Sequence, residues 1–379
     1  MNVAVVTPRY PPVSTGGGER SAKLLAENLA ETERIDSVTV LAFDGDGTHE
    51  TNGVLVDRQG TVSSTVTEWQ NLRVWPILRS RLSEFDIVHS YNMELHPVVG
   101  AITNRQDIPS VATLNSYQFF PSSVSNTTPN PGERVYELVG HPTTGRVLRH
   151  YVKRIDVFVA LSKAIQRIYE QNGFANCRFE HVPNMIDPTF DAPDSTSTHR
   201  GTYRLLYVGS LAENKGVSYL VRAVSQLPER YSLQIVGDGP KKLDLKELAS
   251  ELNVAGRIEF SGRIPYDRID EVYANADAFV HPGIWPEPLN RTLLEAMQAG
   301  LPVVCTDIGG PPEVIPVSKQ LCEPADSNSL AAAISRVSRT EIDLGRINRE
   351  HINSNYNPGQ IISRIVNVYE LLMSERTPN

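Results

Sequence analysis

The sequence predicts an α/β protein made of two doubly wound, Rossmann-like domains that face each other across a cleft. Short apolar stretches rich in Val and Ile alternate with segments of helical period almost throughout the chain. Strands that are apolar on both faces and separated by helices are typical of parallel sheets covered on both sides. The alternation stops once, at a stretch rich in Pro, Asp, Ser and Thr over 183–201, and then restarts. A length of 379 residues also fits two domains at roughly 150 residues each.

The first domain is predicted over 1–185, and the interruption of the pattern places a linker at 186–201. Val-rich and Ile-rich runs in this half predict strands at 3–7, 38–43, 86–89, 110–113, 156–161 and 179–182. Helical spacing of apolar residues predicts helices at 18–31, 68–83, 94–104 and 162–172. Ligands of such sheets bind beyond the carboxyl ends of the strands.

The second domain is predicted over 202–357 by the same signals. Its expected strands are 204–209, 232–236, 258–260, 278–281, 302–306 and 320–322. Its expected helices are 217–226, 241–252, 268–274, 291–299 and 329–337. A last helix, at 358–374 within the segment 358–379, is predicted to cross back to the first domain.

Charge and cysteine content exclude several classes of protein. Acidic residues outnumber basic ones 44 to 36, which argues against a chain that mainly binds nucleic acid. The three cysteines are dispersed and form no CxxC pair, so we expect neither a disulfide framework nor a zinc site but a reducing, cytoplasmic setting. The N-terminus MNVAVVTPRYPP lacks the basic start of a signal peptide, and no apolar run is long enough to cross a bilayer.

Two short loops have the residues expected of a phosphate site. Gly16-Gly17-Gly18-Glu19 follows a predicted strand and opens a helix. Glycines let the backbone come close to a ligand, and the N–H groups at a helix start attract anions. Lys215 stands just before another helix, in YVGSLAENKG, where its ammonium can reach a phosphate. A flexible loop and a solvated lysine are the alternative interpretations.

The most informative segment is HPGIWPEPLNRTLLEAMQAGLPVV, which begins at His281. Its two glutamates, Glu287 and Glu295, stand eight positions apart, one in a loop and one inside a helix that starts near Asn290. Carboxylates accept hydrogen bonds from sugar hydroxyls, and the helix start offers N–H donors to a phosphate. The spacing alone is also that of a solvated helix face.

In its context this segment resembles the E-x7-E signature of the retaining family-4 glycosyltransferases, which have the GT-B fold. The resemblance covers essentially the whole chain. It rests on motifs in the expected order: PRYPPVSTGGGER, DIVHSYN, SVATLNSY, FVALSKAIQRIYEQNG with HVPNMID, YVGSLAENKG, VGDGP, GRIPYDRIDEVYANADAFVHPG and DIGGPPEVI.

The resemblance implies roles for side chains of the second half. Glu295 is expected to hold the ribose hydroxyls of a nucleotide sugar, and Glu287 the hydroxyls of the sugar that is transferred. Lys215 is expected to neutralise the diphosphate. Ser210 stands where the family usually has an arginine after the glycine of this loop, so diphosphate binding depends more on Lys215.

Backbone groups complete the implied donor site. Gly17 and Gly18 are expected to pack against the diphosphate from the first half. In the second half the base is expected at Arg263 and Ile264, and the phosphate at the N–H groups of Leu289, Asn290 and Arg291. Asn290 replaces a glycine found in many members, and asparagine tolerates left-handed backbone better than most residues. Asn115 occupies the place of a histidine in a T-x-H pattern, which leaves His89 as an alternative contact to the sugar.

The implied reaction moves a hexose from a UDP- or GDP-linked donor to an acceptor hydroxyl with retained anomeric configuration. The family needs no divalent metal, and the leaving phosphate takes the acceptor's proton, so no general base is assigned. The D-x-D of Asp44 and Asp46 is a metal-binding pattern of another glycosyltransferase fold, but we interpret it as an exposed acidic turn. His141, His150, His181, His281 and Cys305 have no metal-ligand spacing and are interpreted as structural or loop residues.

Other functions on the same scaffold remain open. The chain could be a nucleotide-sugar epimerase or phosphorylase, or a catalytically idle subunit that binds a sugar nucleotide. The acceptor, a glycan or a lipid-linked molecule, is expected on the first domain near the irregular stretch 115–132. The basic run 146–154 could place the protein at an anionic membrane, such as the inner face of the plasma membrane. A solvated helix face is the alternative.

Overall fold

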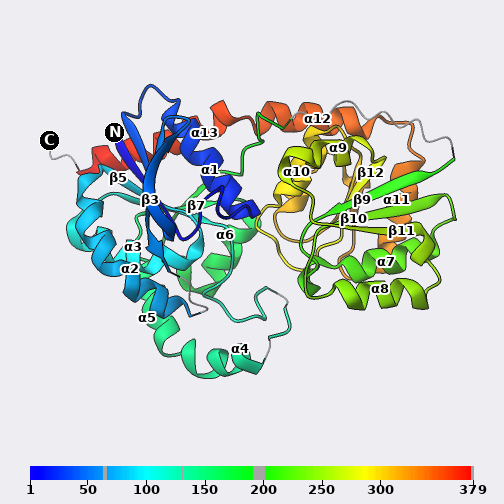
Figure 1. The fold of residues 1–379 in the computed structure, drawn as a ribbon, viewed down its shortest axis with the longest axis horizontal. Coiled ribbons are helices and arrows are strands. Elements are labelled where there is room, and N and C mark those ends of the chain that lie inside the picture. The colour runs from blue at the N-terminus through cyan, green and yellow to red at the C-terminus, as the bar shows by residue number, and fades with distance from the viewer. Residues whose placement is uncertain (63–65, 126, 130, 191–200, 377–379) are drawn as a thin grey trace. The chain divides into compact units, whose positions relative to one another are not determined.

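In the computed structural model the chain forms two compact units, described over residues 1–62, 66–125, 127–129, 131–190 and 201–376. The first unit comprises Met1–Val124, Thr128–Met185 and Pro358–Asn379, and the second comprises Ile186–Asn357 with Ser125–Thr127. Most of the linker expected at 186–201 lies outside the described residues. Each unit is an α/β body with its own sheet (Figure 1).

The sheet of the first unit has eight strands in the order β3-β4-β2-β1-β5-β6-β7-β8. All neighbouring strands are parallel except β3 and β4, which are antiparallel. The strands are β1 (Asn2–Thr7), β2 (Ser37–Ala42), β3 (Asp44–Thr51), β4 (Val54–Thr61), β5 (Ile87–Ser90), β6 (Ser110–Leu114), β7 (Val157–Ala160) and β8 (Arg178–His181).

Helices cover both faces of this sheet. Along β1, Val3 and Val5 contribute to one core and Ala4 and Val6 to the other, because successive side chains of a strand point to opposite faces. Helices α1 and α13 pack on the first of these cores, and α2 and α3 on the second. The helices of the unit are α1 (Gly17–Ala30), α2 (Thr67–Arg81), α3 (His96–Gln106), α4 (Pro131–Val135), α5 (Thr144–Val152), α6 (Lys163–Tyr169) and α13 (Pro358–Arg376).

The sheet of the second unit is entirely parallel, with the order β11-β10-β9-β12-β13-β14. Its strands are β9 (Tyr203–Val208), β10 (Tyr231–Val236), β11 (Ile258–Gly262), β12 (Ala278–His281), β13 (Val303–Thr306) and β14 (Leu321–Cys322). Its helices are α7 (Val217–Gln226), α8 (Lys242–Glu251), α9 (Ile269–Ala274), α10 (Arg291–Gln298), α11 (Ser327–Ser338) and α12 (Leu344–Asn355). The prediction of doubly wound parallel sheets is therefore confirmed.

The interpretation of Asp44 and Asp46 as an exposed acidic turn is wrong in two respects: both residues lie in β3, and Asp44 is largely buried, whereas Asp46 is exposed as expected. Asp44 begins β3, which pairs with β4 across a tight turn at Asn52-Gly53, where both residues have positive φ. Asn-Gly is a strong signal for a two-residue hairpin turn. The Asp44 carboxylate is largely buried, pairs with Arg58, and accepts a hydrogen bond of 2.8 Å from the backbone N–H of Tyr10. This aspartate therefore anchors the loop that follows β1.

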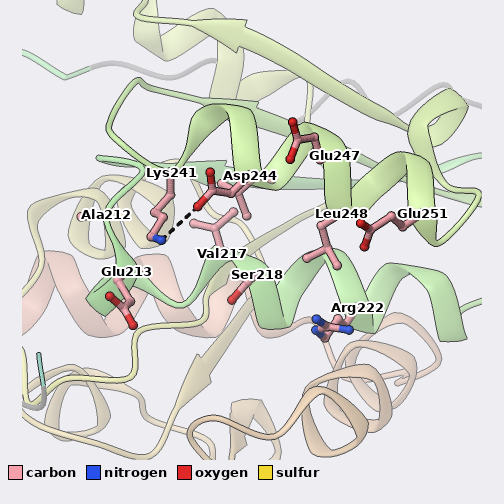
Figure 2. Close-up of a pocket in the computed structure, with 11 residues that line it drawn as sticks. Ala212, Glu213, Val217, Ser218, Arg222, Lys241, Asp244, Glu247, Leu248 and Glu251 are labelled. Carbon is pink, nitrogen blue, oxygen red and sulfur yellow. Dashed lines mark hydrogen bonds and ion pairs between the residues drawn. The ribbon is translucent and has the colours of Figure 1, made fainter. Parts of the chain in front are cut away.

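A pocket of about 330 Å³ lies between α7 and α8 (Figure 2). Four acidic side chains line it, against two basic ones, Arg222 and Lys241. One of the two is already engaged, because the Lys241 ammonium lies 2.9 Å from the carboxylate of Asp244. The excess of negative charge is unfavourable for a phosphate-bearing ligand. The acidic residues of the pocket are Glu213, Asp244, Glu247 and Glu251.

Among the described residues, no helix combines the length and the hydropathy that crossing a bilayer requires.

Candidate functional site

The strand order of the second unit defines where its ligand crevice lies. Strands β10 and β11 follow on one side of β9, and β12, β13 and β14 on the other. Chain connections therefore diverge between β9 and β12, and such a switch point leaves a crevice at the carboxyl ends of the strands. The loops that leave these two strands contain Lys215 and Glu287. The topology thus brings together two residues that stand 72 positions apart in the sequence.

Lys215 and Glu287 form an ion pair in this crevice. The Nζ atom of Lys215 lies 2.7 Å from Oε1 of Glu287, and both side chains are largely shielded from solvent. The indole of Trp285 adds two contacts: its Nε1–H donates to Oε2 of Glu287 at 3.3 Å, and the ammonium of Lys215 lies 4.9 Å from the ring centroid. One cation and one anion are therefore held side by side against an aromatic surface, which reduces the screening by water.

Two glycines fix the loops that present this pair. Gly216 has a φ of +67°, and a Cβ there would lie 1.9 Å from the carbonyl oxygen of Pro282. Gly309 has a φ of +74°, and a Cβ there would lie 2.6 Å from the backbone N and O of Glu287. Both positions favour glycine, because the backbone is left-handed and because a side chain would clash with neighbouring backbone. The two loops are also joined directly, because the N–H of Ile284 donates to the carbonyl of Asn214 at 3.0 Å.

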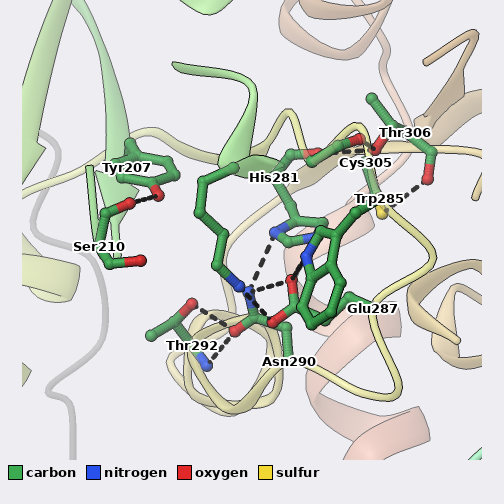
Figure 3. Close-up of polar contacts among 11 residues, drawn as sticks. Tyr207, Ser210, His281, Trp285, Glu287, Asn290, Thr292, Cys305 and Thr306 are labelled. Atoms are coloured by element: carbon green, nitrogen blue, oxygen red, sulfur yellow. Dashed lines mark hydrogen bonds and ion pairs between the residues drawn. The ribbon is translucent and has the colours of Figure 1, made fainter. Parts of the chain in front are cut away.

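His281, which the sequence analysis treated as structural, contacts the site (Figure 3). Its Nε2 lies 3.4 Å from Oε2 of Glu287, and its Nδ1 lies 3.1 Å from Nδ2 of Asn290. Asn290 is also the N-cap of α10, since its Oδ1 accepts the Thr292 N–H at 2.8 Å. An amide nitrogen can only donate, so Nδ1 of His281 accepts and Nε2 carries the proton that faces Glu287.

Burial and the charges of neighbouring groups determine the protonation states of Glu287 and His281. Burial would raise the pKa of Glu287, but Lys215 and His281 outweigh it, and the pKa lies below its usual value. Burial lowers the pKa of His281 to about 4, with Lys215 acting in the same direction and Glu287 opposing it. At neutral pH the cluster therefore holds an ammonium, a carboxylate and a neutral imidazole.

Glu295 lies on α10, the helix that Asn290 caps, and is buried more deeply than Glu287. It is 4% exposed, and its carboxylate accepts hydrogen bonds from Tyr273 at 3.0 Å and from Tyr266 at 3.2 Å. The Nε of Arg291 lies 3.7 Å from the same carboxylate. Burial raises the pKa of Tyr273, with the nearby Glu295 adding to the effect, so this hydroxyl stays a donor. The structure thus adds two tyrosines as partners of Glu295.

The remaining predicted residues of this unit lie at the same edge of the sheet. Ser210 follows β9, is exposed, and accepts the Tyr207 hydroxyl at 2.8 Å through its carbonyl oxygen. Arg263 and Ile264 follow β11, with Arg263 exposed and Ile264 half-buried. The start of α10, which presents the backbone of Leu289, Asn290 and Arg291, directly follows the loop of Glu287.

The first unit gathers a second set of predicted residues. Its switch point lies between β1 and β5, and the loops after these strands carry the glycine run and Asn92. A Cβ on Gly18 would lie 2.6 Å from Oδ1 of Asn92 and 3.5 Å from Nδ2 of Asn115. Asn115 donates to Asn92 at 2.6 Å, and Asn92 donates to Thr7 at 3.0 Å. Gly18 and Asn115 are therefore neighbours, joined by an asparagine for which the sequence analysis proposed no role.

The backbone of Asn92 is constrained, which was not predicted from the sequence. Its φ is +66°, which is uncommon outside glycine and marks constrained backbone.

Gly17 lies at the start of α1, and a Cβ there would meet nothing within 4 Å. The loop before it is held by Arg9, whose guanidinium bonds Glu19 at 3.0 Å and Glu94 at 2.7 Å. The glycine run is thus open at Gly17 and tightly packed at Gly18.

The prediction of His89 as a sugar contact does not fit the structure. Its side chain is fully buried on β5, with Nδ1 2.6 Å from the Tyr369 hydroxyl and Nε2 2.7 Å from the Thr113 hydroxyl. Both ring nitrogens are engaged inside the protein, so neither faces a ligand. The reason is that every residue of β5 is buried. His89 lies within this strand, in agreement with the strand expected at 86–89, and a place near the strand end does not expose its side chain to a ligand.

We expect the free energy of unfolding to fall as the pH is lowered from about 6.5 to about 4. Burial lowers the pKa of His89 to about 3, and of His96 and His281 to about 4. The unfolded chain then binds more protons than the folded one, so stability is lost as the pH falls through this window. Urea unfolding at a series of pH values measures it. Replacing His89 by Gln should flatten the slope, and an unchanged slope would contradict the assignment.

Comparisons with known proteins give the class of the chain. Residues 15–190 match the family described as Glycosyltransferase Family 4, and residues 192–355 match the family described as Glycosyl transferases group 1. The two matches follow one another along the chain and together span most of it. The two matches together identify the chain as a family-4 glycosyltransferase.

Relatives in sequence agree with this class. An uncharacterised glycosyltransferase of Methanocaldococcus jannaschii is 26% identical over 98% of this chain and 99% of its own length. A GDP-mannose-dependent alpha-(1-6)-phosphatidylinositol monomannoside mannosyltransferase of Mycolicibacterium smegmatis is 30% identical, over 46% of this chain and 50% of that protein. The second match thus spans only half of either protein.

Solved structures confirm the GT-B fold. Sucrose-phosphate synthase from Thermosynechococcus elongatus matches with a TM-score of 0.80 at 19% identity and covers 99% of both chains. Anabaena HepE in complex with UDP-glucose matches with a TM-score of 0.74 at 19% identity, over 99% of this chain and 100% of that one. At these identities the likeness concerns the fold.

Proposed function

We propose that this glycosyltransferase moves a hexose from a UDP- or GDP-linked donor to an acceptor hydroxyl, with retention of the anomeric configuration and without a divalent metal. The observation that carries the proposal is the pairing of Lys215 with Glu287 at the switch point of the second sheet. This pairing supports the proposal because Lys215 can bind a diphosphate and Glu287 can bind sugar hydroxyls, and both lie at the switch point, where ligands of such sheets bind.

Each group of the crevice has a role in this reaction. Lys215 and the start of α10 neutralise the charge that develops on the leaving diphosphate. Glu287 accepts hydrogen bonds from the hydroxyls of the transferred sugar, and the neutral His281 orients that carboxylate through its Nε2–H. Glu295, supported by Tyr266 and Tyr273, accepts the ribose hydroxyls. Ser210, Arg263 and Ile264 line the edge where base and diphosphate lie.

The chemical step is a front-side displacement. The bond between the anomeric carbon and the phosphate oxygen breaks, and the acceptor oxygen forms its bond on the same face of the sugar. The proton of the acceptor hydroxyl passes to the leaving phosphate oxygen, so no side chain needs to act as a base. The products are the glycoside and the nucleoside diphosphate.

For the first unit we propose the contacts that the family resemblance implies. These are contacts of the Gly17 and Gly18 backbone with the diphosphate of the donor, and a hydrogen bond between the amide of Asn115 and a hydroxyl of the sugar. The acceptor, a glycan or a lipid-linked molecule, binds near the stretch that follows Asn115. The full-length likeness of HepE, which is in complex with UDP-glucose, supports a uridine donor, and the mannosyltransferase relative supports a guanosine donor. The protein works in the cytoplasm, in contact with the inner face of the plasma membrane.

A donor screen tests the proposal. UDP-glucose, UDP-galactose, UDP-GlcNAc and GDP-mannose are incubated with the protein in EDTA, and release of the nucleoside diphosphate is followed. We expect slow release from one donor, with or without EDTA, and NMR of the product should show the donor's anomeric configuration. Binding of a donor without turnover would favour a missing acceptor or an idle subunit. Activity that EDTA abolishes would overturn the metal-free mechanism, and an inverted product would overturn retention.

A further inference from the structure

A chain of hydrogen bonds joins the carboxyl ends of β1, β5 and β6 in the first unit. The hydroxyl of Thr7, the last residue of β1, donates to the backbone carbonyl of Arg9 at 3.0 Å. The amide of Asn92 donates to the Thr7 oxygen at 3.0 Å, and the amide of Asn115 donates to Oδ1 of Asn92 at 2.6 Å. The loop that leads to the glycine run is thus connected to Asn115 through two side chains.

The first member of this chain fixes the direction of every bond in it. A carbonyl oxygen carries no hydrogen, so the single hydrogen of the Thr7 hydroxyl points to Arg9. The Thr7 oxygen then accepts, so Asn92 turns its Nδ2 toward Thr7 and its Oδ1 toward Asn115. Asn115 must therefore meet Asn92 with its nitrogen.

The end of the Asn115 amide that points away from Asn92 is its carbonyl oxygen. Asn115 is half-buried, and within the described part of the chain no donor group reaches its Oδ1. An amide oxygen accepts hydrogen bonds and cannot donate them. The first unit therefore presents a hydrogen-bond acceptor here, and its natural partner is the O–H of a ligand.

Asn92 adopts an unusual conformation while it makes these contacts. Its φ of +66° and ψ of +123° lie outside the regions that residues other than glycine ordinarily occupy, and it is buried. It precedes the short 3-10 helix η2 (Met93–Leu95), yet its side chain makes no capping hydrogen bond, although asparagine is a preferred capping residue. Both ends of its amide serve the chain of hydrogen bonds instead, and strained backbone of this kind is frequent at functional sites.

Asn92 also lies against the start of α1. A Cβ on Gly18 would lie 2.6 Å from Oδ1 of Asn92, so a side chain at this position would displace the amide. The same oxygen thus contacts the glycine run and accepts the N–H of Asn115. A shift of this one side chain would disturb both groups that the first unit is proposed to bring to a ligand.

We infer that Asn92 is a positioning residue, which turns the Asn115 amide so that its carbonyl oxygen accepts a hydrogen bond from a ligand hydroxyl. Asn92 acts through Asn115, because its own Nδ2 and Oδ1 are already engaged inside the protein. This role deepens the proposed function and rests on it for the identity of the ligand, a sugar. The resulting specificity is for a sugar hydroxyl that donates its hydrogen.

NMR of the side-chain amides tests the orientation of Asn115 without any turnover. In isotope-labelled full-length protein, the Nδ2 protons of Asn115 are assigned by their loss in Asn115→Ala. We expect the proton that faces Asn92 to be shifted downfield by its short hydrogen bond. Asn92→Gly allows the positive φ but removes the amide, so this shift should disappear, whereas Asn92→Asp keeps an acceptor and should keep it. A downfield proton that persists in Asn92→Gly, or is absent from the wild type, would overturn the assignment.

Kinetics with the donor that turns over test the role in the reaction. Asn92→Gly is expected to lower kcat about tenfold, because a misplaced contact to the substrate costs rate. In the Asn115→Ala background the same replacement should have little further effect, since residues that act through one contact are not additive. Losses that multiply in the double variant, or full activity of Asn92→Gly, would overturn the role of Asn92.

Asn253→Gly is the matched control for these measurements. Asn253 is an exposed asparagine of the second unit with a φ of +56°, so the same replacement at a positive φ should leave the activity unchanged. A wild type that releases no nucleoside diphosphate from any donor would contradict the proposed function, and the NMR shifts would still support or overturn the orientation of Asn115. Normal turnover of the wild type together with full activity of Asn92→Gly would overturn only the role of Asn92.

Discussion

Replacing Glu287 by Gln is expected to lower kcat/KM for the nucleotide sugar at least about a hundredfold. The change keeps the shape of the side chain but removes the charge, and hydrogen bonds to a charged acceptor are worth about 1.5–3 kcal/mol each. At about 1.4 kcal/mol per tenfold change, loss of one or two such bonds gives this magnitude. Initial rates of nucleoside diphosphate release over a range of donor concentrations measure it.

Glu213→Gln is the matched control for this measurement. Glu213 stands two positions before Lys215, but it is exposed and belongs to the acidic pocket between α7 and α8. Its replacement removes one negative charge from the loop that carries Lys215 without touching the pair. Comparable losses in both variants would indicate a general electrostatic effect. An unchanged rate for Glu287→Gln would remove Glu287 from the site.

Replacing Lys215 by Met is expected to lower kcat about a hundredfold or more and to destabilise the second unit. The rate falls because the leaving diphosphate loses its cation. The stability falls because the buried carboxylate of Glu287 loses its partner at 2.7 Å, and a buried charge left without its partner costs about 3–5 kcal/mol. Donor turnover and urea unfolding measure the two effects separately.

The double variant Lys215→Met with Glu287→Gln separates the chemical role from the structural one. It leaves no charge unpaired, so its free energy of unfolding should recover most of what Lys215→Met loses, while its activity should stay low. Such non-additivity is expected of residues in direct contact. Recovery of activity together with stability would mean that the pair only maintains the fold. Equal stability of the single and double variants would mean that the pair is not buried in solution.

The parallel strands of both units were predictable, because runs such as Val3–Thr7 are apolar on both faces, and the periodicity of the helices between them is clear. The β3–β4 hairpin was not predicted, since its first strand, DGDGTHET, is polar and glycine-rich and reads as a loop. Only its pairing with β4, whose Val54 and Val56 are buried, makes it a strand. Helix α12 was missed for a related reason: LGRINREHINSN has few apolar positions, and its stability comes from packing and from the cap at Asp343.

At the site, the sequence indicated Lys215 and Glu287 through their motifs, and the structure pairs them. The sequence did not indicate that His281 contacts the site, because a histidine at the end of the apolar strand AFVH resembles a core residue. Nor did it pair Glu295 with Tyr266 and Tyr273, since partners 29 and 22 positions away can be recognised only when the chain is folded. The prediction of His89 as a sugar contact was wrong because its strand, β5, is buried on both faces.

The position of α13 in the first unit has a consequence for how the chain matures. Ile361, Ile365 and Tyr369 are buried in the same core as β1 and α1, although the whole second unit separates them in sequence. During synthesis, at about 5–20 residues per second, the core of the first unit is therefore incomplete until α13 has been made, whereas the second unit, which lies almost entirely in the single stretch Ile186–Asn357, can already fold. Until α13 arrives, the apolar face that it covers is open to molecular chaperones, and truncation before Pro358 should produce a chain that aggregates rather than one that merely lacks a helix.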